Sequence, residues 1–238
     1  TLLGEREPAL VAFRATDGSE CWRFDPSRRG GLLGQALGAA KGVADPNRYP
    51  RIPCESNGDL FVPVVDHDGT EPVGGAVVEL DRRTGEHVRG ISLDHPPQSM
   101  VSATDTRIVL EVGANSSELQ LLNREGLSPV GSFAITDRPP FYSDIAATES
   151  GFALAGRDRL FHLDTDGTVR WQRQVQSGPP TIVGDEIVHV NVSTGALQRR
   201  SLSSGSAVDE FELVDEEWSS PTVTIGTDRV FVRSQNRL

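Results

Sequence analysis

The sequence predicts an all-β fold built from a repeated unit of about forty residues. Glycine-centred turns recur at Gly18, Gly85, Gly126, Gly167 and Gly205. The last three spacings are 41, 41 and 38 residues, and near-equal spacings of this size indicate a structural repeat. Short apolar or alternating runs flank the turns, and no long 3.6-residue period occurs, which favours strands over helices.

Each repeat contains four short strand-like runs separated by turns. One example has apolar runs at 181–183 and 187–190 on either side of a Gly-Asp turn, followed by the hairpin around Gly205. Four antiparallel strands in a unit of this length are typical of a β-propeller blade. The fold class that the sequence predicts is therefore a β-propeller of four-stranded antiparallel blades.

The number of blades follows from how the strands group along the chain. Complete units are expected at roughly 51–92, 99–135, 142–176 and 180–213. Residues 9–25 supply two further strands and residues 218–238 the complementary two, so we expect a fifth blade closed by strands from both termini. The alternative is that the chain forms part of a six- to eight-bladed ring.

Residues 27–50 interrupt the repeat within what we expect to be a single domain, 1–238. Leucine and alanine recur at helical spacing in 31–41, which favours a short helix, whereas the glycines there favour a solvated loop. We expect this segment to be an inter-blade insertion. A second, shorter insertion is expected at 66–71.

Charge excludes some classes of partner. The net charge is −11, and Lys41 is the sole lysine among 23 basic residues. A net-negative surface argues against nucleic acid and anionic membranes as partners. Because the chain begins at Thr1 and not at methionine, we expect a processed, extracytoplasmic protein. Any contact with a membrane would be through an anchor that has been removed. We also expect the protein to be a monomer.

The two cysteines, Cys21 and Cys54, permit two interpretations. They could pair as a disulfide that closes a long loop. We favour two separate buried thiols, because one is expected on an outer strand and the other on an inner strand. Neither has Cys-x-x-Cys spacing, so zinc is not indicated.

Short motifs within the repeat resemble those of the quinoprotein-type (PQQ-like) propeller repeat. Residues 219–223 resemble its Ser-Ser-Pro opening strand, and residues 80–85 match its Leu-Asp-x-x-Thr-Gly ending. A tryptophan also follows glycine by four residues in two repeats. The resemblance implies that this tryptophan docks on a neighbouring blade. The blade-motif residues are Gly18, Trp22, Asp81, Gly85, Gly126, Gly167, Trp171, Gly205 and Pro221.

The chain also departs from the family pattern. Arg89 and Val130 stand where two of the tryptophans would be, and the unit around Gly205 is degenerate. The quinone-dependent dehydrogenases of the family are longer and use adjacent cysteines beside the cofactor, whereas these cysteines are far apart. The chain therefore resembles the non-enzymatic members, which implies a scaffold that presents loops and a central funnel to a protein or small ligand, with no cofactor.

Few residues suggest chemistry. Asp66 and Asp68 echo the start of a calcium loop, as do Asp164 and Asp166, but both sequences are incomplete as hand-type loops. The five histidines form no recognised ligand pair, and we expect His162 and His189 to be packed or partly exposed. An alternative function, a glycan-active enzyme, would need two convergent carboxylates. Its candidates are Asp105, Asp144 and Asp185.

Overall fold

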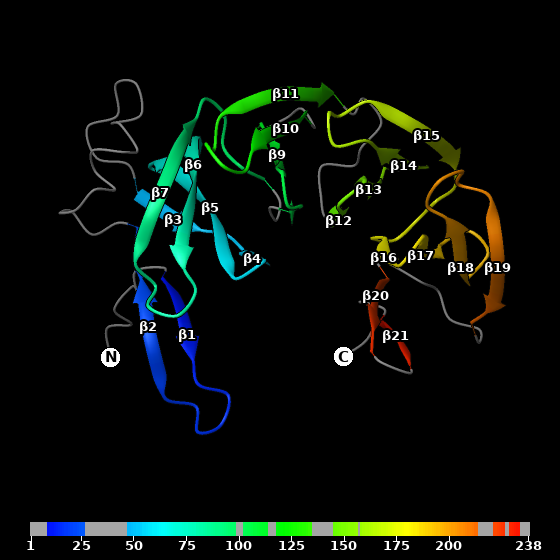
Figure 1. Ribbon diagram of the computed structural model, residues 1–238, viewed down its shortest axis with the longest axis horizontal. Coiled ribbons are helices and arrows are strands. Elements are labelled where there is room, and N and C mark those ends of the chain that lie inside the picture. The colour runs from blue at the N-terminus through cyan, green and yellow to red at the C-terminus, as the bar shows by residue number, and fades with distance from the viewer. Residues whose placement is uncertain are drawn as a thin grey trace. The chain divides into compact units, whose positions relative to one another are not determined.

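The computed structural model describes residues 9–26, 47–98, 102–113, 118–134, 145–156, 158–213, 221–226 and 229–233. These residues form β-strands and turns without any helix, and every pairing in the six sheets is antiparallel (Figure 1). The strands are β1 (Leu10–Phe13), β2 (Glu20–Phe24), β3 (Asn47–Pro50), β4 (Cys54–Ser56), β5 (Asp59–Asp68), β6 (Glu71–Asp81), β7 (His87–Leu93), β8 (Ser102–Ala103), β9 (Arg107–Val112), β10 (Glu118–Asn123), β11 (Pro129–Ala134), β12 (Ile145–Thr148), β13 (Gly151–Ala155), β14 (Arg159–Leu163), β15 (Val169–Gln174), β16 (Thr181–Val183), β17 (Glu186–Asn191), β18 (Ala196–Ser201), β19 (Ala207–Glu212), β20 (Thr222–Ile225) and β21 (Val230–Arg233).

Four of the sheets are blades in the order that the repeat predicts. Blade 1 contains β3 to β7, blade 2 contains β8 to β11, blade 3 contains β12 to β15, and blade 4 contains β16 to β19. In blades 2, 3 and 4 consecutive strands pair, so each of these units is a meander, as the hairpin turns require, whereas in blade 1 both β3 and β4 pair with β5. The prediction of an all-β fold with four-stranded antiparallel blades is confirmed.

Strands β1 and β2 form an N-terminal pair, and β20 and β21 form a C-terminal pair. The two pairs are separate two-stranded sheets and are not hydrogen-bonded to each other. The fifth blade shared between the termini, and the total number of blades, therefore stay predictions.

The chain divides into two compact units, each described here by itself. The first comprises Thr1–Val101, Leu110–Ala114 and Glu125–Ser128, and the second Ser102–Val109, Asn115–Arg124 and Pro129–Leu238. In the second unit the first strand of each sheet lies beside the first strand of the next, from β8 through β12 and β16 to β20. This succession of neighbouring first strands is the arrangement expected of propeller blades.

Blade 1 differs from the expected blade at both predicted insertions. Residues 47–50 were expected in an insertion but form β3, which pairs with the far half of β5; residues 27–46 lie outside the described residues. Residues 66–71 are also no insertion. They are the end of a long β5–β6 hairpin, which turns at Gly69 with a φ of 62°, as a type II′ turn requires.

A tryptophan links the N-terminal pair to blade 1. Trp22 on β2 donates its indole N–H to the Arg82 carbonyl at 2.9 Å, and its ring lies against Gly85. Asp81 shapes this turn, because its Oδ1 accepts the backbone N–H groups of Arg83 and Thr84 at 2.8 and 2.7 Å. These hydrogen bonds, with that from the Thr84 amide first, lower the pKa of Asp81.

The same contact recurs between blades 3 and 4. Trp171 on β15 donates its indole N–H to the Leu202 carbonyl at 2.7 Å, and its ring covers Gly205. Trp171 is 7% exposed and is the more deeply buried of the two indoles. The turn that it contacts, around Gly205, is the one whose sequence departs most from the repeat motif. Trp22 and Trp171 thus each lie on the last strand of a sheet and dock on the turn before the last strand of the next sheet.

The other three motif glycines, Gly18, Gly126 and Gly167, depart from this pattern. At the turn of blade 2 the left-handed residue is Leu127, with a φ of 49°, and not Gly126. At the turn of blade 3, Gly167 meets the aliphatic side chain of Leu121 from blade 2 in place of an indole. Gly18 lies in a turn with open space around it, and Pro221 packs closely against Gly178.

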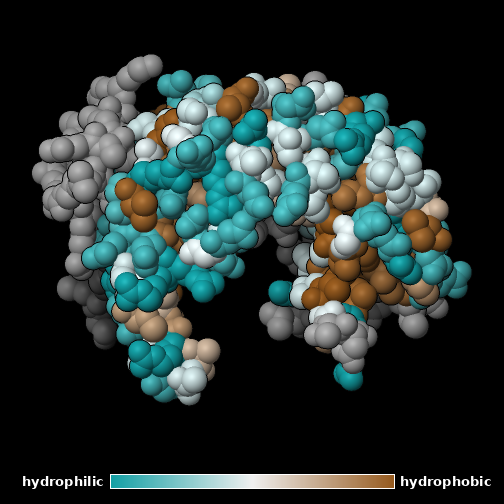
Figure 2. All heavy atoms as spheres, in the orientation of Figure 1, coloured by the Kyte–Doolittle hydropathy of each residue, from teal (hydrophilic) through white to brown (hydrophobic). Residues whose placement is uncertain are grey.

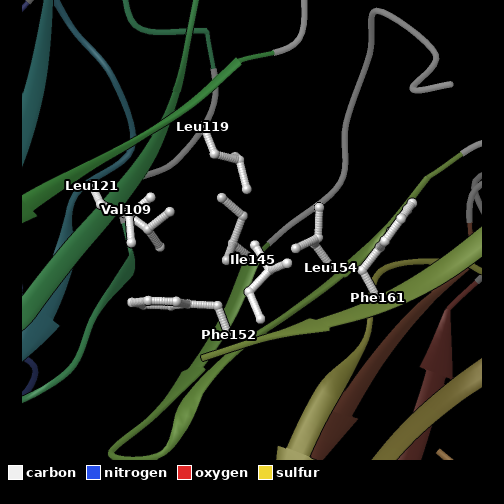
Figure 3. Close-up of a cluster of buried hydrophobic side chains, with 8 residues drawn as sticks. Val109, Leu119, Leu121, Ile145, Phe152, Leu154 and Phe161 are labelled. Carbon is white, nitrogen blue, oxygen red and sulfur yellow. The ribbon is translucent and has the colours of Figure 1, made fainter. Parts of the chain in front are cut away.

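A hydrophobic cluster joins each pair of neighbouring sheets within a unit. Between blades 2 and 3, side chains from β9 and β10 point toward those from β12, β13 and β14 (Figure 3). A second cluster joins blades 3 and 4 around Trp171, and another joins blade 4 to the C-terminal pair around Val223. Figure 2 shows hydrophobic side chains gathered near β16 and β20, where these clusters lie.

Substitution of Gly205 tests the tryptophan contact. A Cβ there would lie 2.7 Å from Trp171 Cδ2, and the φ is 67°, so G205A must both displace the indole and adopt a left-handed backbone. We expect a loss of about 3 kcal/mol or more in the free energy of unfolding, measured by urea denaturation. The matched control is G184A in the same blade, where φ is 57° and no atom lies within 4 Å; it should lose about 1–2 kcal/mol. Equal losses would contradict the contact.

Candidate functional site

The far end of blade 1 holds one of the weak metal candidates in a buried ion pair. Asp66 Oδ1 lies 3.0 Å from Arg48 Nε on the facing strand β3, and the two side chains are 6% and 13% exposed. Arg48 therefore occupies the carboxylate that a cation would need. Asp68, two residues further along β5, is exposed at the tip of the hairpin.

Two aromatic rings meet on the opposite face of the same strands. The rings of Tyr49 and His67 lie edge to face, with 4.8 Å between their centroids. Each is next in sequence to a member of the Arg48–Asp66 pair, one on β3 and the other on β5, and neighbouring residues of a strand face opposite sides of the sheet. The ion pair on one face and the two rings on the other form what we call the platform at the end of blade 1.

The first strand of blade 1 bends beside this platform. Between β3 and β4, residues 51–53 leave the regular pairing, and the Arg51 N–H donates to the Pro63 carbonyl at 2.7 Å. Ile52 in the bend is 61% exposed. We call Arg51, Ile52 and Pro53 the bend, and it presents an apolar side chain next to a cationic one at the first-strand edge of the blade.

The acidic candidates do not form a catalytic pair in the described residues. Asp105 and Asp185 lie in exposed turns of different blades, and Asp144 lies outside the described residues. The other calcium-like sequence is a hairpin turn, in which Asp166 Oδ1 accepts the Thr168 N–H at 2.9 Å and Asp164 pairs with Arg170 at 2.8 Å.

Two histidines are fully buried between strands. His162 lies beside Trp171, with 5.7 Å between ring centroids, and its ring nitrogens are buried without hydrogen-bond partners among the described residues. Burial, and then the charge of Arg170, lowers the pKa of His162. This histidine is packed in the interior as a neutral ring.

His189 belongs to a hydrogen-bonded network within blade 4. Its Nδ1 lies 2.9 Å from Ser177 Oγ, and its Nε2 accepts from Arg200 Nε at 3.2 Å. Arg200 Nη2 in turn donates to Gln198 Oε1 at 2.9 Å, and Gln198 Nε2 donates to Glu210 Oε2 at 2.9 Å. The network connects the buried ring to the exposed outer strand.

The serine and histidine of this network have the wrong polarity for nucleophilic catalysis. Because an arginine can only donate, His189 Nε2 must be an acceptor, so Nδ1 carries the proton and donates to Ser177 Oγ. The hydroxyl donates onward to the Gly178 carbonyl at 2.6 Å. A ring in this tautomer cannot remove the serine proton, so the arrangement holds blade 4 to the preceding segment.

The favoured interpretation of the cysteines is correct about pairing and wrong about burial. No disulfide joins Cys21 and Cys54. Cys21 is exposed on β2, and Cys54 is partly exposed on β4. Neither is a buried small hydrophobe.

Within the part of the chain that the structure describes, no group of three or more His, Cys, Asp or Glu side chains is placed to hold a metal ion. The same residues contain no helix with the length and hydropathy needed to cross a membrane. Sequence reasoning did not find the Arg48–Asp66 pair or the Ser177–His189–Arg200 network. Both join residues on different strands, and no local motif marks them.

Comparison with solved structures identifies the chain as a β-propeller. No protein-family model and no curated protein match it. It is similar in structure to BamB from Moraxella catarrhalis, with 17% identity and a TM-score of 0.58 over 97% of this chain and 65% of that one. For Sqt1 from Saccharomyces cerevisiae the values are 10%, 0.57, 95% and 63%. For a europium-containing methanol dehydrogenase they are 13%, 0.52, 88% and 48%.

These similarities concern the fold alone, since every identity is low. The chain spans less than two thirds of the length of each of these structures. One of these structures is a dehydrogenase and the other two are not named as enzymes, so the fold does not select a function.

Acidification should destabilise the protein through His189. Burial, and then the charge of Arg200, lowers the pKa of His189 from 6.5 to about 4. Because the unfolded chain then binds more protons than the folded chain, stability is full above the unfolded pKa and falls as pH drops from about 6.5 toward about 4, by about 3 kcal/mol in total. Urea midpoints across this range should fall accordingly. H189N should flatten the decline, whereas H95N, at an exposed position, should leave it unchanged. An identical slope in H189N would contradict the assignment.

Substitution of the carboxylates at the end of blade 1 distinguishes an ion pair from a calcium loop. D66N should lower the free energy of unfolding by about 3 kcal/mol, because it leaves Arg48 without its charge partner. D68N, at an exposed position, should change it by less than about 0.5 kcal/mol. A chelator should leave the melting temperature of the wild type unchanged. If the chelator lowers the melting temperature of the wild type, and D66N and D68N lower it equally, bound calcium would be supported instead.

Proposed function

We propose that the chain is a non-catalytic binding or scaffold propeller that presents loops to a protein or small ligand. The quinoprotein-type repeat resembles that of non-enzymatic members of its family, and the fold is one that serves binding as readily as catalysis. The proposal needs no cofactor and no catalytic residue.

The observation that carries this proposal is that arginine binds three of the buried charged or titratable side chains, Asp66, Glu79 and His189. Asp66 is bound by Arg48, and Glu79 lies 2.6 Å from Arg89 Nε. His189 accepts from Arg200 and faces a serine in the unreactive tautomer. Groups committed to arginine in the interior support structure, whereas a catalytic acid or base needs a free edge toward substrate.

The bend of blade 1 is the surface that we assign to binding. Ile52 is a large apolar side chain exposed beside a cationic neighbour, on a segment whose backbone is held by the Arg51–Pro63 hydrogen bond. Irregular segments on a rigid scaffold are common places for recognition.

Location and assembly complete the proposal. The resemblance to the outer-membrane assembly lipoproteins and to sensor propellers supports an extracytoplasmic location. The net charge of −11 supports a partner that is neither nucleic acid nor an anionic membrane. We propose that the chain acts as a monomer.

Two matched substitutions in blade 1 test the binding surface. I52S removes the exposed side chain of the bend, and V88S removes one that is 55% exposed on the outer strand β7. A partner captured from an extract of the source organism would be purified and titrated calorimetrically against both variants and the wild type. We expect I52S to weaken binding by about tenfold and V88S to leave it unchanged.

An equal effect of the two substitutions would exclude the bend as the binding surface.

Catalysis is tested separately, by adding pyrroloquinoline quinone, calcium and an alcohol with a redox dye. Measurable turnover would overturn the non-catalytic assignment whatever the binding results.

A further inference from the structure

Strand β19 is the outer edge of blade 4, and it is unusually open. All six of its residues are exposed, among them Val208 at 52% and Phe211 at 47%. An edge strand with exposed apolar side chains is a template on which another chain can pair. The strand also carries three carboxylates, Asp209, Glu210 and Glu212.

The direction of the backbone groups follows from the hairpin hydrogen bonds. The Leu213 N–H donates inward to the Gly195 carbonyl at 3.1 Å, just beyond the pairing of Phe211 with Leu197. Because backbone N–H groups alternate between the two sides of a strand, Phe211 and Asp209 also face inward. The N–H of Glu210 therefore points to the free edge.

This outward N–H is already occupied. Asp209 Oδ1 accepts it at 2.9 Å, from the preceding residue of the same strand. The Asp209 carboxylate is also drawn toward Arg199, with 3.8 Å between Oδ2 and Nη1, and Arg199 Nε lies 2.7 Å from Glu186 Oε2. A row of charges across β17, β18 and β19 thus holds the carboxylate near the centre of the edge.

We propose that Asp209 is an autoinhibitory contact that keeps β19 from pairing with a second copy of the chain. A strand added to this edge needs the Glu210 N–H as a donor, and Asp209 must release it first. Both residues of the contact lie on the same strand, so the contact forms in a single molecule before a second copy approaches. This role is independent of the proposed binding surface on blade 1.

Three substitutions separate the hydrogen bond from the charge. D209A removes both, D209N removes the charge but keeps an acceptor, and E212Q removes a charge from the same edge but leaves the contact intact. Self-association would be measured by sedimentation velocity over a range of protein concentrations in about 0.5 M sodium chloride, which screens repulsion between facing carboxylates.

We expect D209A to self-associate about tenfold more tightly than the wild type, because each of two copies no longer has to give up an internal hydrogen bond. D209N and E212Q should behave as the wild type. Equal sedimentation of D209A and wild type would overturn the proposal. So would equal association of E212Q and D209A, because charge alone would then close the edge.

Hydrogen exchange in the dilute wild type gives a readout that does not depend on any variant folding. Glu212 also has an outward N–H group, by the same alternation, whereas the register shift between Arg199 and Arg200 interrupts the alternation at Val208. The Glu210 amide should exchange several-fold more slowly than the Glu212 amide, because it donates to Asp209. Equal exchange of the two amides would show that the contact does not persist in solution and would overturn the proposal.

Discussion

The contact between an indole and the glycine turn of the next sheet is the interaction on which this fold depends. A four-stranded blade cannot bury both of its faces alone, so its stability comes from its neighbours. The indole supplies a large apolar surface and one N–H, and the turn supplies a carbonyl and a residue without Cβ. Asp81 and Gly85 are therefore parts of one device with Trp22, although sixty residues separate them.

The blades could be predicted from the sequence because their signals are local. Two-residue turns such as Asn57–Gly58, where both φ angles are positive, mark where a hairpin must reverse, and strand alternation marks what lies between. The irregular elements could not be predicted in this way. The repeat spacing predicts an insertion over the residues of strand β3, because these residues become a strand only by pairing with β5, more than ten residues away.

The candidate site shows the same limit. Asp66 has the spacing of a calcium ligand, but pairing between strands places Arg48 opposite it, and the ion pair outweighs the motif. Cys21 and Cys54 were expected in the interior because thiols are usually buried, yet which face a strand residue presents is set by the neighbouring sheet. Whether a side chain can bind a ligand therefore depends on its partners on neighbouring strands. These partners cannot be identified from a single sequence without the fold.

The docked indoles also make the protein optically informative. Trp171 is almost enclosed, with the Arg173 guanidinium 5.7 Å from its ring, whereas Trp22 is half-buried in the other compact unit. An indole that moves from an apolar contact into water changes its emission. If Trp218 is replaced by phenylalanine together with either Trp22 or Trp171, the emission of the one remaining indole reports on one unit at a time. Coincident transitions would then mean that the two units unfold as one cooperative system, and separate transitions would mean that each has a stability of its own.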